Sequence, residues 1–231
     1  MCGRFVFEAD EKQIAQAFAV KLFNNVSTKA RYNVAPTTPV CIVLNDKDNT
    51  REARTMRWGL IPSWVKDLSQ FKATTFNARD DRIEESRVFS PAFKKRRCII
   101  PISGYYEWKK ISASKKQPYY FKAKNGSMLA LAGVWDKATL SDGTVIESCS
   151  IITTYPNEVT EEYHDRMPVI LSPSDYDKWL SLDTTAEELK AMLKPCHPDL
   201  LEIYAVDKGI GSVKNDFATN IVPLSKEETL F

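Results

Sequence analysis

The chain has 231 residues, 43% hydrophobic and 27% charged, a composition typical of a globular protein with a sizeable core. The formal net charge is only +2, so overall charge does not identify a partner. No run of about 18 apolar residues occurs, and no basic segment followed by an apolar one opens the chain, so we expect neither a membrane span nor a signal peptide. We therefore expect a cytoplasmic protein.

The cysteines and histidines argue against a metal site or a disulfide framework. The five cysteines are odd in number and widely spaced, and none forms a Cys-x-x-Cys pair: Cys2, Cys41, Cys98, Cys149 and Cys196. This pattern favours a reducing compartment and, for the three central cysteines, burial as small hydrophobic residues. The two histidines, His164 and His197, are too far apart to suggest ligand spacing, so we expect no metal and no other cofactor.

The first third of the chain predicts short strands and one helix. Asp10 is a suitable N-cap for a helix over residues 11–20, with Ile14, Ala17 and Phe18 on one face. Strands are expected at residues 4–7, 40–44 and 52–57, a loop at 21–30 and an irregular segment at 31–36. In the aromatic loop that follows, we expect Trp58 in the core and Trp64 at the surface.

The remainder predicts further strands with interspersed helices. Helical segments are expected after Asn77-Ala-Arg79 as far as Arg87, from Ser90 and Pro91, and over residues 172–180 and 184–192. Strands are expected at 98–102, 104–108, 118–123, 128–135, 145–154 and 200–206, with Asn125-Gly126 as the turn of a hairpin. Residues 207–220 are read as loop and 224–231 as a loose tail. The predicted fold is a single α+β domain over residues 1–231, with a largely antiparallel, barrel-like sheet.

Cys2 is chemically unusual if Met1 is removed. It then carries a free α-amine, with a pKa near ~8, beside a thiol with a pKa near ~8.5. An aldehyde can form an imine with the amine, and the thiol can close onto the imine carbon to give a five-membered thiazolidine. On position alone, an incidental thiol at a frayed terminus is the commoner explanation.

Charge is concentrated in one segment. Between Arg79 and Arg97 there are seven basic and four acidic residues, a surplus larger than that of the whole chain. Such a patch is compatible with phosphate binding. A solvated helix face of mixed charge is an equally good explanation.

Two further residues are candidates for proton transfer. In the strand 104–108, alternation places Tyr106 and Trp108 on one face and Tyr105 and Glu107 on the other. Burial among aromatic rings would raise the pKa of Glu107 toward neutrality, although an exposed strand-edge position is equally compatible with the sequence. His164 is followed by Asp165 and Arg166, which could orient it; taken alone, it would more often be a surface histidine.

Taken together, these segments resemble the SOS-response-associated peptidase (SRAP) family. The matching motifs occur in the family's order and approximate spacing over nearly the whole chain: Cys2-Gly3-Arg4, Arg31-Tyr-Asn-Val-Ala-Pro36, Trp58-Gly-Leu-Ile-Pro62, Asn77-Ala-Arg79, Gly104-Tyr-Tyr-Glu-Trp108, His164-Asp-Arg-Met-Pro168 and Gly211-Ser-Val-Lys-Asn215.

The resemblance implies a protein that binds single-stranded DNA and reacts with abasic sites. A ring-opened abasic deoxyribose presents an aldehyde, and Cys2 would convert it into a thiazolidine crosslink that shields the lesion. By family match, Asn77 positions Cys2 or the opened sugar, Glu107 is the acid/base residue and His164 is a second proton-handling residue. A monomer is expected, and junctions of single- and double-stranded DNA are a further candidate substrate.

The resemblance also implies the residues that hold DNA. Three arginines match positions that hold phosphates: Arg4, Arg79 and Arg166. Pro36 and Trp64 match residues that wedge or stack against the strand. Family members often have a second bulky aromatic after Trp64, where this chain has Val65, which puts the strength of the wedge in doubt.

Alternative functions use the same residues. Cys2 could be the nucleophile and His164 the base of an autopeptidase or amidohydrolase, consistent with the family's name. The imine intermediate could also undergo β-elimination, a weak abasic-site lyase activity. Finally, the protein could bind single-stranded DNA without covalent chemistry, in which case Cys2 would be irrelevant.

Overall fold

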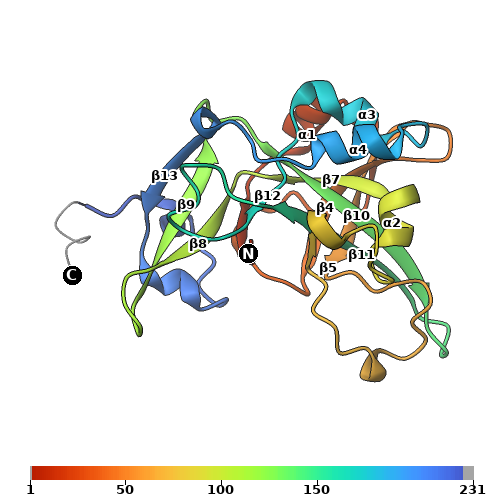
Figure 1. The fold of residues 1–231 in the computed structure, drawn as a ribbon, viewed down its shortest axis with the longest axis horizontal. Helices are drawn as coiled ribbons and strands as arrows, with labels where there is room; N and C mark the ends of the chain where they lie inside the picture. The colour runs from red at the N-terminus through yellow and green to blue at the C-terminus, as the bar shows by residue number, and fades with distance from the viewer. Residues whose placement is uncertain (1, 226–231) are drawn as a thin grey trace.

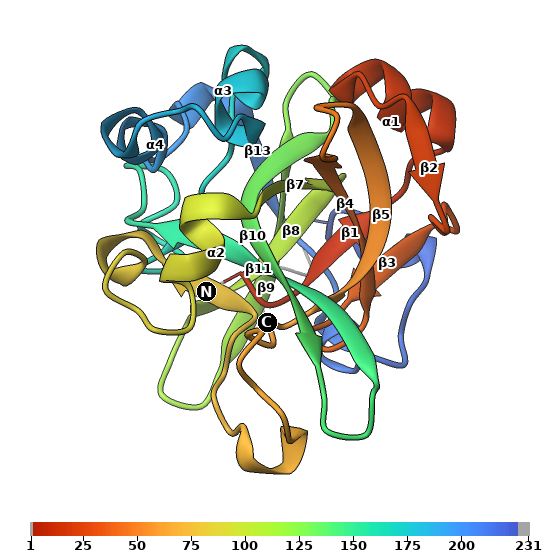
Figure 2. The same ribbon diagram turned by 90° about the vertical axis from the view of Figure 1, so that its right-hand side faces the viewer.

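The computed structural model describes residues 2–225 and has an α+β fold built on a closed five-stranded barrel (Figure 1 and Figure 2). The strands of the ring, in order, are β11 (Val145–Thr154), β10 (Leu129–Thr139), β7 (Arg97–Ile102), β4 (Pro39–Asn45) and β5 (Arg51–Trp58). A parallel pairing between β11 and β5 closes the ring, and its other four pairings are antiparallel. The predicted barrel-like, largely antiparallel sheet is confirmed.

A second, five-stranded sheet carries the N-terminal strand. Its strands, in order, are β13 (Leu201–Ala205), β9 (Lys116–Ala123), β8 (Gly104–Lys110), β1 (Phe5–Phe7) and β3 (Arg31–Val34). Three short strands extend the barrel sheet: β2 (Leu22–Asn24) along β5, and β6 (Asn77–Arg79) and β12 (Met167–Pro168) along β11.

Four short α-helices cover the outside. They are α1 (Glu11–Phe18), α2 (Ser90–Lys95), α3 (Tyr176–Leu180) and α4 (Ala186–Met192), and α1, α3 and α4 lie at the top in both views (Figure 1 and Figure 2). Asp10 caps α1 as predicted, through a capping box with Gln13. Ile14 and Phe18 are buried as expected, whereas Ala17 is exposed.

Three predictions of local structure are wrong, because strand pairing with distant residues or a side-chain hydrogen bond outweighs the local sequence preference. The segments 21–30 and 31–36 contain β2 and β3, which are held by pairing with β5 and β1. After Arg79 there is only a 3₁₀ turn, Asp80–Arg82, instead of a helix. The Asp80 carboxylate accepts the backbone N–H of Asp81 at 2.8 Å, an interaction that competes with helix formation.

The predicted hairpin at Asn125-Gly126 is also wrong, although the turn itself forms. Gly126 has φ +72° and donates its N–H to Ala123 O at 3.0 Å. The flanking strands nevertheless separate: β9 pairs with β8 and β13, whereas β10 pairs with β7 and β11. β10 instead forms a hairpin with β11 around Asp142-Gly143.

The buried residues largely agree with the sequence predictions. Trp58, Cys41, Cys98 and Cys149 are buried as expected. None of the helices in residues 2–225 has the length and apolar character needed to span a bilayer. Leu224 donates its N–H to Ala205 O at 2.9 Å, so the predicted loose tail begins with an anchored residue, and residues 226–231 lie outside the described part.

Candidate active site

The N-terminal segment lies inside the molecule. Phe5 pairs with Tyr105, and the backbone N–H of Tyr106 donates to Arg4 O at 2.9 Å, so this end of the chain runs along β8. Cys2 is 0% exposed. The explanation of Cys2 as a thiol at a frayed terminus is therefore wrong. The sequence prediction for Met1 lies outside the described residues.

Trp58 brings the two sheets together around Cys2. Its ring packs on Phe5 with centroids 5.0 Å apart, and its Nε1–H donates to Phe76 O at 2.8 Å. Phe76 precedes Asn77, the first residue of β6, which pairs with Ile151 of β11. A buried tryptophan thus fixes the segments that carry Cys2 and Asn77.

Asn77 contacts Cys2 directly. Its Nδ2–H donates to the backbone carbonyl of Cys2 at 2.8 Å. Its Oδ1 is buried and accepts no hydrogen bond within residues 2–225. Because a buried acceptor is normally satisfied, this oxygen is available to a group that enters the site.

Glu107 is the second group beside Cys2. It lies on β8 and is 4% exposed, so the strand-edge explanation is wrong. Burial raises the pKa of Glu107 to about 7, and the negative charge of Asp165 contributes. Burial, followed by the charge of Glu107, also raises the pKa of the Cys2 thiol. The thiol is thus protonated at neutral pH, next to a carboxyl that can exchange protons at that pH.

His164 lies in the loop between β11 and β12, which packs over β8 and β9. Tyr163 contacts Tyr119 and Phe121 with ring centroids 4.7 and 5.1 Å apart, and Glu162 pairs with Lys109 at 2.9 Å. These contacts bring the His164 segment to the strand that carries Glu107.

Two groups contact the Nδ1 atom of the His164 ring. The backbone N–H of Arg166 lies 3.0 Å from Nδ1, and Asp165 Oδ1 lies 2.7 Å from the same nitrogen. Burial lowers the pKa of His164, and Asp165 partly opposes this effect. Asp165 and Arg166 thus orient the imidazole ring through Nδ1.

The predicted phosphate-binding arginines have partners within the protein. Arg79 forms a two-pronged pair with Asp81, at 2.9 and 2.6 Å, and Arg166 pairs with Asp80 and Thr153 O. Arg4 donates to three acceptors near the C-terminal loop: Asn33 Oδ1 at 2.8 Å, Ile210 O at 2.9 Å and Gly211 O at 3.2 Å. The acidic partners Asp80 and Asp81 were missed by the site prediction, although they lie within the charged segment that it singled out.

A groove of about 400 Å³ begins at Asn77. It is lined by Asn77, Arg79, Arg82, Glu85, Ser86 and Phe89. All of these residues come from Asn77 and the charged segment that follows it, so the groove reaches the residue bonded to Cys2.

The predicted stacking residues are separate from these groups. Trp64 is 43% exposed, with the Arg87 guanidinium 4.8 Å above its ring and Phe71 edge-on at 5.8 Å. Val65 is buried in a small apolar cluster. The second aromatic beside Trp64 is therefore Phe71, six positions beyond Val65, which sequence spacing did not reveal. Pro36 lies half-buried in the turn after β3.

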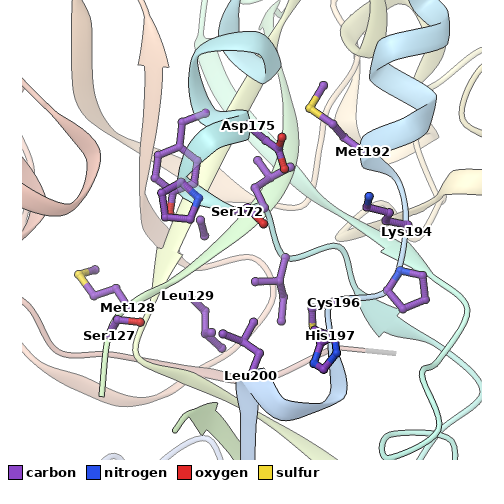
Figure 3. A pocket seen from close by; sticks show the side chains of 16 residues that line it. Ser127, Met128, Leu129, Ser172, Asp175, Met192, Lys194, Cys196, His197 and Leu200 are labelled. Atoms are coloured by element: carbon purple, nitrogen blue, oxygen red, sulfur yellow. The ribbon is translucent and has the colours of Figure 1, made fainter. Parts of the chain in front are cut away.

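A second cavity, of about 490 Å³, contains none of the predicted site residues. It lies beside α3 and α4, with Cys196 and His197 on one side and Met128 and Leu129 on the other (Figure 3). His197 is largely exposed, as expected for a surface histidine. No group of three His, Cys, Asp or Glu side chains within residues 2–225 could hold a metal ion.

Comparison with known proteins identifies the family. The family model described as SOS response associated peptidase (SRAP) matches residues 1–213. The abasic site processing protein YoqW of Bacillus subtilis is 36% identical over 218 residues, covering 94% of this chain and 96% of that protein. The abasic site processing protein YedK of Escherichia coli is 28% identical, covering 97% of this chain and 100% of that protein.

A solved structure agrees with this match. The crystal structure of a protein from Bacteroides thetaiotaomicron superposes with a TM-score of 0.87 at 26% identity, covering 97% of this chain and 100% of that one. The sequence motifs, the family match and the shared fold lead to one conclusion: this chain belongs to the SOS response associated peptidase family.

Proposed function

We propose that this protein processes abasic sites in single-stranded DNA by forming a covalent thiazolidine crosslink through Cys2. The relatives named above are abasic site processing proteins. The observation that carries the proposal is the environment of Cys2. It is fully buried, bonded through its carbonyl to Asn77 at 2.8 Å, and close to the buried carboxyl of Glu107.

The reaction begins with removal of Met1 by hydrolysis, which frees the α-amine of Cys2. The amine adds to the aldehyde carbon of the ring-opened deoxyribose, and the resulting carbinolamine loses one water to give an imine. The Cys2 sulfur then bonds to the imine carbon, and the thiol proton is delivered to the nitrogen. One aldehyde and one aminothiol thus give one thiazolidine and one water.

Glu107 moves the protons in this sequence. A carboxyl with a pKa of about 7 is present in both forms near neutral pH, which is the condition for efficient general acid–base catalysis. It accepts a proton as the amine attacks and returns one as the carbinolamine hydroxyl leaves as water. It also accepts the thiol proton, which burial otherwise holds on the sulfur.

Asn77 and His164 complete the site. The unpaired Oδ1 of Asn77 accepts a hydrogen bond from the amine or from a hydroxyl of the opened sugar. His164, whose pKa is lowered by burial, handles a second proton as the sugar ring opens and when the imine reverses. Ring closure by sulfur diverts the imine from β-elimination, so we propose that strand cleavage is a minor activity.

The groove at Asn77 supplies the path for DNA. Arg79 and Arg166 would contact phosphates that flank the lesion, and Arg4 would support the same end of the site. Trp64 and Pro36 would stack against the strand, where each stacked base contributes about 1–3 kcal/mol. The proposed site is complete within one chain, so a monomer suffices. We place its activity in the cytoplasm.

The test is denaturing gel electrophoresis after incubation with an abasic single-stranded oligonucleotide. The wild-type protein should give an adduct that survives detergent and high salt, and Cys2→Ala should give none. Cys41→Ala removes a different buried thiol and should leave the adduct intact. An equally abundant adduct with Cys2→Ala would refute the proposal.

The alternatives give different outcomes in the same experiment. A non-covalent DNA-binding protein would show only complexes that salt dissolves, because phosphate contacts weaken steeply with ionic strength. A peptidase would turn over an amide substrate without forming a DNA adduct.

A further inference from the structure

Tyr105 carries a buried hydroxyl without a partner. The residue lies on β8 and is 1% exposed, and its ring stacks on Phe121 with centroids 4.8 Å apart and planes 15° apart. Its hydroxyl forms no hydrogen bond within residues 2–225. Burying a hydroxyl without a hydrogen bond costs folding free energy, and a phenylalanine at this position would avoid that cost. The hydroxyl therefore calls for a functional explanation.

The hydroxyl lies at the candidate site. Tyr105 shares the face of β8 that carries Glu107 and pairs with Phe5, three residues beyond Cys2. It is close enough to interact electrostatically with three groups: Cys196, Cys2 and Glu107. Cys2 and Tyr105 also belong to the same buried cluster, so the orphaned donor lies in the region of the sulfur that the proposed reaction uses.

Tyr106 provides the contrast. It lies on the opposite face of β8, packed with Val6 in a separate cluster, and its hydroxyl donates to Tyr32 O at 2.8 Å. The two consecutive tyrosines thus differ in their hydrogen bonding. The Tyr106 hydroxyl has a partner within the fold, whereas the Tyr105 hydroxyl has none within residues 2–225.

We propose that the Tyr105 hydroxyl is a further catalytic group, which donates a hydrogen bond to the Cys2 sulfur as the carbon–sulfur bond of the thiazolidine forms. Glu107 removes the thiol proton, and the resulting thiolate is stabilised by the phenol until its electron pair bonds to the imine carbon. The π electrons of the imine move to the nitrogen, which takes up a proton. The phenol donates a hydrogen bond throughout and transfers no proton.

One observation favours Cys2 over Cys196 as the acceptor. The Cys196 sulfur already lies 3.9 Å from the Nδ2–H donor of Asn157, which also donates to Cys196 O at 3.0 Å. Burial raises the pKa of both thiols, so a donor at the Cys2 sulfur would offset an environment that disfavours its thiolate. Burial raises the pKa of Tyr105 as well, so it remains a donor throughout the neutral range.

This inference rests on the proposed function and is tested by Tyr105→Phe. Under single-turnover conditions at pH 7, the variant should crosslink abasic single-stranded DNA about tenfold more slowly, because a hydrogen bond to a charged group is lost. Its rate should rise to the wild-type value only at higher pH, where the thiolate forms without the donor. Binding to an oligonucleotide that carries a non-reactive abasic analogue should be unchanged. Tyr106→Phe should keep the wild-type rate and pH profile.

The outcomes separate the inference from the proposed function. If wild type crosslinks and Tyr105→Phe has the same rate and pH profile, the catalytic role of Tyr105 is refuted while the crosslinking function stands. A slower rate without a shift in the pH profile refutes the hydrogen bond to sulfur. If Cys196→Ala reproduces the effect of Tyr105→Phe, the hydroxyl serves Cys196 instead. If wild type forms no adduct, the proposed function itself fails.

Discussion

The buried carboxyl of Glu107 connects reactivity to stability at the level of a single residue. Its pKa is about 7 in the folded protein, against an ordinary value of 4.5, and burial is the main cause. The folded state therefore binds a proton that the unfolded state has released. The stability that this proton provides is complete below pH 4.5 and is lost as the pH rises through 7.

We accordingly predict that Glu107→Gln stabilises the protein at alkaline pH. The shift corresponds to about 3 kcal/mol as an upper limit, since one pKa unit is about 1.4 kcal/mol. Denaturant unfolding should show a higher free energy of unfolding for Glu107→Gln at pH 8.5 and almost none of this gain at pH 4. Glu162→Gln, at an exposed position, is the control and should change little at either pH. A gain of equal size at both pH values would contradict the assigned cause.

At the scale of secondary structure, β6 and the 3₁₀ turn after it carry both a proposed phosphate-binding arginine and the acidic residues that pair with the arginines. Asn77 points inward to Cys2, and Arg79 lies at the groove. The turn then places Asp81 against Arg79 at 2.6 Å and Asp80 against Arg166. The carboxylates are paired with the guanidinium groups that we propose for phosphates, so the proposed DNA binding requires that these ion pairs open.

This competition predicts tighter DNA binding when one carboxylate is neutralised. Asp81→Asn should lower the Kd for unmodified single-stranded DNA by up to about fivefold, because an exposed ion pair is a weak competitor that is screened by salt. The effect should shrink at high salt. Fluorescence anisotropy at two salt concentrations measures it. Asp48→Asn makes the same charge change in the exposed turn between β4 and β5 and should have a much smaller effect. Unchanged or weaker binding by Asp81→Asn would show that Asp81 does not compete with DNA.

The secondary-structure elements also show which features the local sequence can predict and which it cannot. Capping by Asp10 and the turn at Asn125-Gly126 depend on a few neighbouring residues, and both were predicted. The partners of the strands on either side of that turn depend on distant residues, and there the hairpin prediction failed. β3 was missed for the same reason, because its pairing with β1 stabilises a segment without clear alternation.

At the scale of the whole molecule, the barrel and the second sheet bring together residues that are distant in sequence. Cys2 and Asn77 are joined by a hydrogen bond across 75 positions of sequence, and Glu107 belongs to β8. Motif order predicted the members of this site. It could not predict the acidic partners of Arg79 and Arg166 or the unpaired hydroxyl of Tyr105, because each depends on tertiary contacts.

The most direct measurement is the intact mass of the adduct and the position of its attachment. After reaction with an abasic oligonucleotide, mass spectrometry should give the mass of the protein without Met1 plus that of the oligonucleotide, less one water. Fragmentation should locate the added mass on Cys2, at both its nitrogen and its sulfur, so that the thiol no longer reacts with an alkylating agent. An adduct on a lysine, or an adduct that leaves the Cys2 thiol free, would contradict the thiazolidine.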